Sequence, residues 1–142
     1  MSERDRGLVY RVKRAERQIG AQHANIDLLF DLLRDAVSSG ARTDIQSAFD
    51  RLYGAVEAHF SLEDEVFFPA LHGLHPNHEG ELQALSREHE RFVGEMGAIR
   101  SALRRPTLDA FERAVAEFRL AMGEHEAREE RLISLLGASS SE

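Results

Sequence analysis

A regular spacing of core-type residues in the C-terminal part of the chain constrains the fold more than any other feature. The residues recur in alternating steps of three and four: Leu108, Phe111, Val115, Phe118, Met122, His125, Glu129, Leu132 and Leu136. Because an α-helix turns once every 3.6 residues, this spacing places the whole set on one helix face. Thr107 suits the start of such a helix, and Gly137 suits its end. The pattern predicts a bundle helix over 107–136.

Three earlier segments repeat this spacing, the first with one interruption at Glu16. Their core-facing residues are Val12, Ile19, His23, Ile26, Phe30, Leu33 and Val37; then Ile45, Phe49, Leu52, Val56, His59, Glu63 and Val66; then Leu82, Leu85, His89, Phe92, Met96, Ile99 and Leu103. Thr43 with Gln46 three residues on has the spacing of a capping box. The expected helices are roughly 7–39, 43–71, 78–104 and 107–136.

Short loops between these segments favour antiparallel neighbours. We therefore predict an all-α, up-down-up-down antiparallel four-helix bundle. The length of 142 residues suits a single domain over 1–142, with a short disordered tail over about 137–142.

The overall composition excludes several classes of function. The formal net charge of −7 disfavours nucleic acid and anionic membranes as partners. The chain has no cysteine, which excludes disulfides, thiolate catalysis and iron–sulfur clusters, so any metal must bind to histidines and carboxylates. No apolar run approaches the roughly 20 residues of a membrane span, and the N-terminal residues form no apolar signal region. We expect a cytoplasmic protein.

Ionisable residues occupy core positions in all four stripes. Each stripe holds one histidine, and two stripes add a glutamate one turn further on: His23, His59, Glu63, His89, His125 and Glu129. A buried, unpaired carboxylate costs several kcal/mol, so two of them require a cation or an extensive hydrogen-bond network. The sequence therefore predicts a metal site in the core.

The expected helix lengths bring the four histidines to one level of the bundle. Counting from each interhelical turn at about 1.5 Å per residue places neighbouring histidines at nearly equal heights, with a mismatch of about 5 Å between His89 and His125. The i, i+4 pairs His59/Glu63 and His125/Glu129 stack on one helix face, where both members can reach a common ion.

The donor types narrow the choice of metal. Imidazole and carboxylate without thiolate suit iron, manganese or zinc, and six donors are too many for one tetrahedral zinc. Two ions fit better. If Glu63 and Glu129 both bridge, the histidines and carboxylates leave about four of the octahedral positions. An oxo or hydroxo bridge would take about two of these, and about two would remain for an exogenous ligand.

The sequences around these residues resemble the hemerythrin family, the HHE cation-binding domains, over essentially the whole chain. The resemblance lies in Ala-His59-Phe-Ser-Leu-Glu63-Asp-Glu-Val-Phe-Phe-Pro69, Arg-Glu-His89-Glu-Arg-Phe, Glu-His125-Glu-Ala-Arg-Glu129-Glu and, more weakly, Gln-His23. The Phe-Pro that usually follows the last of these strings is absent. Ferritin-like di-iron proteins use Glu-x-x-His, and no histidine here has Glu three residues before it.

The resemblance implies two iron ions with an oxo or hydroxo bridge. His23 and His59 would bind one iron and His89 and His125 the other, with Glu63 and Glu129 as bridging carboxylates. The resemblance to oxygen-carrying hemerythrins implies a fifth histidine one turn from the third-helix ligand. Here Leu85 and Val93 occupy the positions one turn either side of His89. The missing histidine disfavours a reversible oxygen carrier.

The resemblance and the missing histidine together favour a protein that binds or turns over dioxygen, hydrogen peroxide or nitric oxide. No catalytic residue beyond the metal ligands is expected, so catalase-like or nitric oxide chemistry would come from the metal. The alternative is a non-catalytic oxygen, iron or redox sensor, or an iron-binding module. A metal-free structural bundle is a third reading, and the oligomeric state stays open.

Several other polar residues have simpler interpretations. Asp27, at i+4 from His23, is expected to flank the site, although a ligand or hydrogen-bonding role stays open. The loop histidines His72, His75 and His78 are expected to face solvent. Acidic residues next to the ligands are interpreted as surface residues: Glu88, Glu124, Glu126 and Glu130. An apolar wall around the open metal positions is expected from Val56, Phe60, Phe92, Phe118 and Met122.

Overall fold

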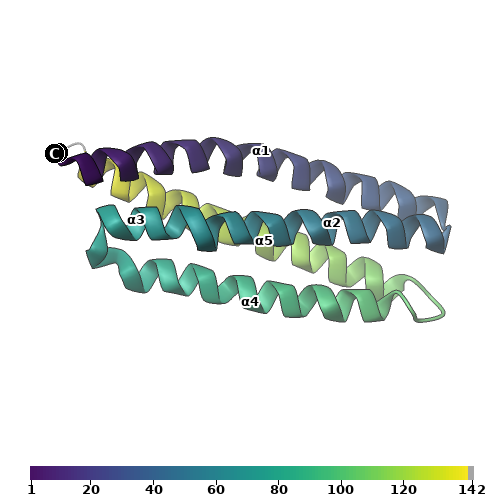
Figure 1. Ribbon diagram of the computed structural model, residues 1–142. Coiled ribbons are helices and arrows are strands. Elements are labelled where there is room, and N and C mark those ends of the chain that lie inside the picture. The colour runs from purple at the N-terminus through teal and green to yellow at the C-terminus, as the bar shows by residue number, and fades with distance from the viewer. Residues whose placement is uncertain (141–142) are drawn as a thin grey trace.

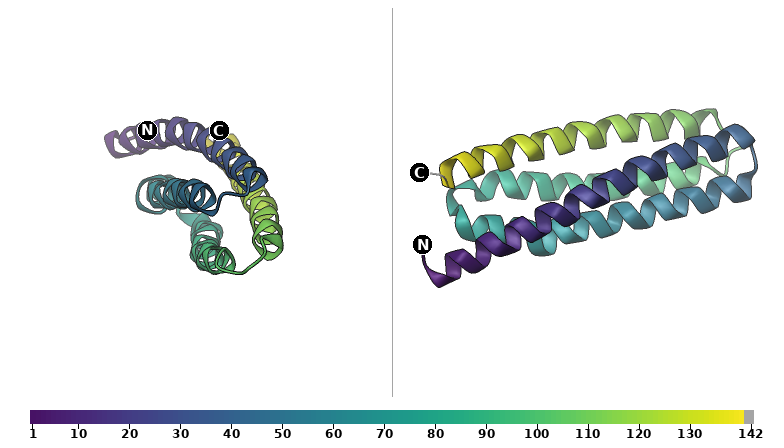
Figure 2. Two further views of the ribbon diagram at one scale, coloured as in Figure 1. Left: turned by 90° about the vertical axis from the view of Figure 1, so that its right-hand side faces the viewer. Right: turned by 90° about the horizontal axis from the view of Figure 1, so that it is seen from above.

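The computed structural model describes residues 1–140, which form a bundle of long helices without strands in that range (Figure 1). The elements are α1 (Glu3–Ser39), α2 (Arg42–Leu62), the π-helix η1 (Glu63–Phe67), α3 (Phe68–Leu74), the 3-10 helix η2 (Pro76–His78), α4 (Glu79–Ala102) and α5 (Asp109–Ser140). Because α2, η1 and α3 follow one another without a break, they form one arm of the bundle. Both chain ends lie at the same end of the molecule (Figure 2). The predicted up-down-up-down four-helix bundle is confirmed.

The first helix has a polar cap at each end. Ser2 precedes it, and its hydroxyl accepts a hydrogen bond from the Asp5 amide at 3.1 Å. This cap starts the helix four residues earlier than the apolar pattern indicated. At the other end Gly40 adopts a left-handed φ of 77°, which glycine reaches without strain, and its amide donates to the carbonyls of Ala36 and Val37.

The other helix ends differ from the expected ones by a few residues. The capping box at Thr43 was wrong, because α2 already begins at Arg42 and Ala41 provides no side-chain cap. The Arg42 guanidinium instead donates to the carbonyls of Leu103, at 2.5 Å, and Pro106, at 2.8 Å, which ties α2 to the loop after α4.

The last helix also departs from its expected bounds. It begins at Asp109, two residues after the expected start at Thr107, and it continues past Gly137 to Ser140. The last residues of the expected tail, Ser141 and Glu142, lie outside the described residues.

A π-helical turn shifts the register of the second arm. The spacing predicted that Val66 faces the core, but it is 41% exposed and Phe67 is fully buried in its place. This prediction was wrong because η1 has a wider turn than an α-helix, which moves the inward position one residue along. The aromatic side chain of Phe67 packs into the apolar core as a result.

The core consists of two apolar clusters with a polar layer between them. One cluster gathers around residues such as Ile26, Val56 and Phe92, and the other around Phe67 and Leu85. On every arm the predicted metal ligands fall between residues of the two clusters, for example His89 between Leu85 and Phe92. The bundle therefore holds its histidines and glutamates at one level, with apolar packing above and below.

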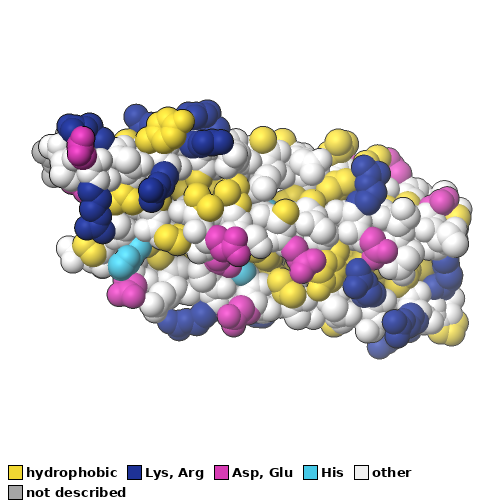
Figure 3. Space-filling view, viewed as in Figure 1, with side chains coloured by type: hydrophobic (Ala, Val, Ile, Leu, Met, Phe, Trp, Pro, Cys, Tyr) yellow, Lys and Arg dark blue, Asp and Glu magenta, His cyan; other side chains and the backbone are white. Residues whose placement is uncertain are grey.

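The surface carries mixed charges. Lys and Arg side chains gather over the N-terminal half of α1 (Figure 3), where all of them are exposed: Arg4, Arg6, Arg11, Lys13, Arg14 and Arg17. None of the helices within residues 1–140 is long and apolar enough to cross a membrane.

Candidate metal centre

The structure brings the six predicted side chains together as two histidine pairs joined by a carboxyl group. The Nε2 atoms of His23 and His59 are 3.1 Å apart, and those of His89 and His125 are also 3.1 Å apart. Glu63 Oε1 lies between the pairs, 3.3 Å from His59 Nε2 and 3.1 Å from His89 Nε2. Each of the four arms contributes one of these histidines, so the four imidazoles lie together in one layer, as expected.

The second carboxyl completes a compact group of donors. Glu129 Oε2 is 3.5 Å from His125 Nε2. One donor atom from each of Glu63, His89, His125 and Glu129 lies within 4.8 Å of all the others, and all four residues are buried. His23 is the most accessible of the six residues, with 19% of its side chain exposed.

Hydrogen-bond acceptors behind the histidines orient their rings. Gln22 Oε1 lies 2.9 Å from His59 Nδ1, and Asp64 Oδ1 lies 2.9 Å from His89 Nδ1. Because both acceptors face Nδ1, the proton belongs on that nitrogen and the Nε2 lone pair points into the centre. Asp64 is itself held by the Ser86 hydroxyl at 2.8 Å.

Glu88 occupies the corresponding place behind His125. Its Oε2 is 3.4 Å from His125 Nδ1, and the Arg128 guanidinium binds the same oxygen. The centre therefore has an outer shell of Gln22, Asp64 and Glu88, which is typical of metal sites whose ligands are held in place.

The buried carboxyl oxygens favour a cation at this centre. Both oxygens of Glu63 and Oε2 of Glu129 are buried without a hydrogen-bond partner within the described residues. Buried polar groups are almost always hydrogen-bonded, and an unpartnered carboxyl carries a desolvation penalty of about 1–3 kcal/mol or more. A bound cation would satisfy these oxygens, so the residues present fit a metal ion.

Burial is also the main cause of the pKa shifts of four of the donors. Burial raises the pKa of Glu63 to about 7, and burial together with the neighbouring Glu63 carboxyl raises the pKa of Glu129 to about 10. Burial, followed by repulsion from the other histidines, lowers the pKa of His59 to about 3 and that of His125 to about 4. At neutral pH both imidazoles are neutral, which is the form that binds metal.

Aromatic rings enclose the centre. Phe60 stacks on His89 with ring centroids 4.1 Å apart, and Phe68 also stacks on this ring, at 5.8 Å. Phe92 meets His125 edge to face at 5.4 Å. The residues expected to form an apolar wall, including Val56, Phe118 and Met122, are all buried. They shield the centre from bulk water on the side of the first apolar cluster.

Two surface depressions reach the centre from opposite sides. One, of about 400 Å³, lies between α1 and α5 and is lined by His23, Phe67 and Glu129 among others. The other, of about 370 Å³, lies between α2 and α4 and is lined by Phe60, His89 and Val93 among others. A small molecule can therefore approach either histidine pair without a large rearrangement.

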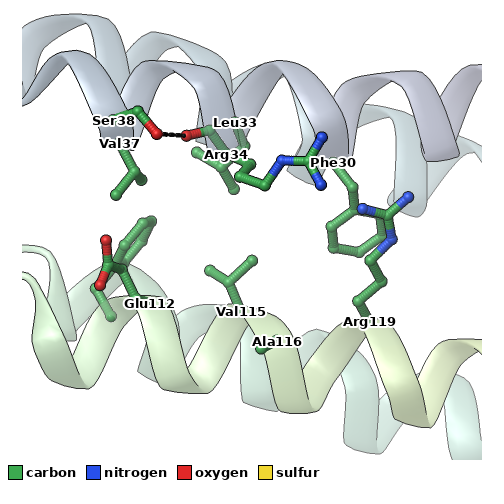
Figure 4. Close-up of a pocket in the computed structure, with 10 residues that line it drawn as sticks. Phe30, Leu33, Arg34, Val37, Ser38, Glu112, Val115, Ala116 and Arg119 are labelled. Carbon is green, nitrogen blue, oxygen red and sulfur yellow. Dashed lines mark hydrogen bonds between the residues drawn. The ribbon is translucent and has the colours of Figure 1, made fainter.

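A third hollow lies away from the centre. It has a volume of about 260 Å³, and Figure 4 shows Leu33 and Val37 of α1 facing Val115 of α5 across it. None of the six predicted ligands lines it. Its mainly apolar wall is part of the packing between α1 and α5.

The sequence interpretation missed several residues around the centre. Glu88 and Glu126 were interpreted as surface residues, but both are partly buried and contact histidines of the centre. Glu126 lies three residues before Glu129, and that helical spacing was an available signal. Asp64 and Gln22 directly adjoin predicted ligands in sequence, and no periodicity marks them.

Asp27 does not join the centre. Its side chain is 68% exposed and lies 4.0 Å from the Arg119 guanidinium. The simpler interpretation of Asp27 as a flanking residue agrees with this position.

The fold and the buried imidazole and carboxylate donors define a metal-binding four-helix bundle. The family model of the hemerythrin HHE cation-binding domain matches residues 14–134. Because this match covers most of the chain, the protein belongs to the hemerythrin HHE cation-binding family. Comparison with curated proteins and with solved structures finds no match.

Proposed function

We propose that this protein is a non-haem di-iron protein that binds or turns over a small oxidant: dioxygen, hydrogen peroxide or nitric oxide. The observation that carries the proposal is the pair of buried glutamates, Glu63 and Glu129, which have three buried oxygens without hydrogen-bond partners next to four histidine rings. Family membership supports iron as the metal. The expected oxo or hydroxo bridge between the ions is part of the proposal.

The ligand assignment follows the two histidine pairs. His23 and His59 would hold one ion, His89 and His125 the other, and Glu63 and Glu129 would be shared between them. Two iron ions bound there would supply redox chemistry and open coordination positions for a small oxidant. Gln22 and Asp64 keep the Nε2 atoms of His59 and His89 aimed inward, which lowers the entropic cost of binding the metal.

The surroundings of His89 support reactive chemistry over reversible oxygen carriage. Leu85 is buried and Val93 is half-buried, so neither position one turn from His89 offers a donor. The depression beside His89 and Val93 gives small molecules access to that side. Phe60 and Phe68 limit the space next to the ring, which favours ligands of a few atoms.

Iron loading tests the proposal directly. Anaerobic addition of Fe(II) to the purified protein should give two irons per chain, and oxidation should produce a charge-transfer absorption in the near ultraviolet. Less than one iron per chain, with no such absorption, would contradict the di-iron assignment.

Turnover is tested separately. The iron-loaded protein should consume peroxide or nitric oxide, and Glu63→Ala should abolish this. Glu65→Ala is the matched control, because Glu65 lies in the same turn but is exposed. Full iron binding without turnover of either oxidant would favour the sensor or iron-binding alternative. A cytoplasmic location stays a prediction from the sequence.

A further inference from the structure

Glu126 is a partly buried carboxyl that the proposed ligand set does not use. It lies on α5, with 23% of its side chain exposed, and its Oε1 is 3.7 Å from Nε2 of His23 on α1. Within residues 1–140 it forms no ion pair with Lys or Arg. Glu88, by contrast, is neutralised by Arg128 and lies near Arg91. Glu126 therefore offers a carboxyl group that no Lys or Arg side chain of the described chain pairs with.

The two histidine pairs are unequally supplied with carboxyl donors. The pair His89 and His125 forms a compact group with both Glu63 and Glu129. For the pair His23 and His59, the contacts on the inner face are the 3.1 Å approach of the two rings and Glu63 at 3.3 Å from His59. The pair His23 and His59 therefore has fewer carboxyl donors, and Glu126 lies next to this pair, at His23.

The separation suits two ligands of one ion. Donors that each lie about 2.1 Å from an ion are about 3.0 Å apart when they are at right angles and about 4.2 Å apart when opposite. The 3.7 Å between Glu126 Oε1 and His23 Nε2 falls within this range. An ion at Nε2 of His23 therefore lies within reach of the Glu126 carboxylate.

We propose that Glu126 is a terminal carboxylate ligand of the ion held by His23 and His59, an inference that rests on the di-iron function proposed above. The ligand set then contains a third glutamate in a protein that lacks a fifth histidine. A carboxylate brings negative charge where an imidazole brings none, so it stabilises the more oxidised state of iron. This preference opposes reversible oxygen release and suits the reduction of an oxidant.

Metal titration of matched variants tests the role of Glu126. Wild type, Glu126→Ala and Glu126→Asp are titrated with Fe(II) under anaerobic conditions and with Co(II), whose visible absorption strengthens when its coordination number falls. We expect two ions in wild type. In Glu126→Ala the affinity for one of them should fall at least tenfold, the other should be unchanged, and the Co(II) absorption should strengthen. Glu130→Ala, an exposed neighbour on the same helix, should behave like wild type.

The aspartate variant separates coordination from charge. Glu126→Asp keeps the charge but withdraws the carboxylate by about 1.5 Å, so it should lose affinity as Glu126→Ala does. Wild-type affinity in Glu126→Asp would mean that charge alone matters and would overturn the proposal. So would unchanged affinities and Co(II) spectrum in Glu126→Ala. Failure of wild type itself to bind two ions would contradict the di-iron function instead.

Discussion

At the scale of single residues, the centre depends on the groups that hold the histidines. Each of His59 and His89 has an acceptor 2.9 Å from Nδ1, which leaves Nε2 free to face the centre. Hydrogen bonds from His89 and Ser86 outweigh the effect of burial and lower the pKa of Asp64, so this carboxylate is ionised at neutral pH. An ionised partner makes the bound imidazole a stronger donor to a metal.

Asp64→Asn should weaken metal binding without unfolding the protein. The amide is a poorer acceptor for His89 Nδ1, and loss of such outer partners typically costs about 10–100-fold in metal affinity. Anaerobic Fe(II) titration measures the effect, with Glu65→Gln as a control at the exposed neighbouring position. Equal affinities in the two variants would show that the contact with Asp64 does not support the ligand.

The metal-free protein should lose stability as pH rises above about 6.5. The folded pKa values of Glu63 and Glu129, about 7 and about 10, exceed the unfolded value of about 4.3, so the folded state binds more protons in between and stability falls with pH. The lowered pKa values of His59 and His125 act in the opposite direction, but only below their unfolded value of about 6.5.

Melting temperatures of the metal-free protein between pH 6.5 and pH 9 check this prediction. Glu129→Gln removes the group with the higher pKa and should flatten the decline above pH 7. Parallel curves for wild type and Glu129→Gln would contradict a protonated Glu129 in the folded state. Metal replaces these protons, so its stabilising effect should grow with pH over the same window.

At the scale of the elements, the π turn η1 determines which side chains of the second arm face the core after the end of α2. It follows the end of α2 and begins at Glu63, one turn after His59, so it positions a predicted ligand and also changes the register of the residues that follow. Phe67, Phe68 and Leu71 pack into the second apolar cluster from the shifted register. π turns of this kind are frequent at functional sites.

Alanine substitutions at the buried Phe67 and at the exposed Val66 should differ sharply in their effect on stability. Phe67→Ala should lower the free energy of unfolding by about 3–5 kcal/mol, because the ring is fully buried. Val66→Ala should change it by less than about 0.5 kcal/mol, since Val66 is 41% exposed. Urea unfolding measures both effects. A larger effect at Val66 than at Phe67 would contradict the shifted register and support the unbroken α-helical register that the spacing predicted.

At the scale of the whole molecule, the polar layer divides the core and weakens the metal-free bundle. Apolar clusters above and below hold the arms together, while the layer between them contains carboxyl oxygens without partners. Metal binding then stabilises the folded chain by mass action, because an unfolded chain does not bring four helices' donors together.

Glu129→Met should stabilise the metal-free protein and abolish its stabilisation by iron. Removing a buried carboxyl oxygen that lacks a hydrogen-bond partner relieves a desolvation cost of about 1–3 kcal/mol. Melting temperatures with and without Fe(II) measure both effects, with Glu130→Met as the exposed control. A less stable metal-free Glu129→Met protein would show that the chain itself satisfies this carboxyl.

The spacing of apolar residues was sufficient to predict the bundle, its four arms and the level at which the histidines meet. Helical periodicity reports which side of each helix is buried, because the backbone geometry is nearly constant from turn to turn. The same logic identified the six candidate ligands as ionisable residues at buried positions, which required no knowledge of how the helices cross.

The tertiary structure alone decided which neighbours complete the centre. The sequence offered Asp27 beside His23, yet the carboxyl that approaches His23 is Glu126 of another helix. It likewise gave no sign that Asp64 would meet His89 or that η1 would replace Val66 with Phe67. These contacts depend on the rotation and crossing of whole helices, which all the packed side chains set together and no single helix encodes.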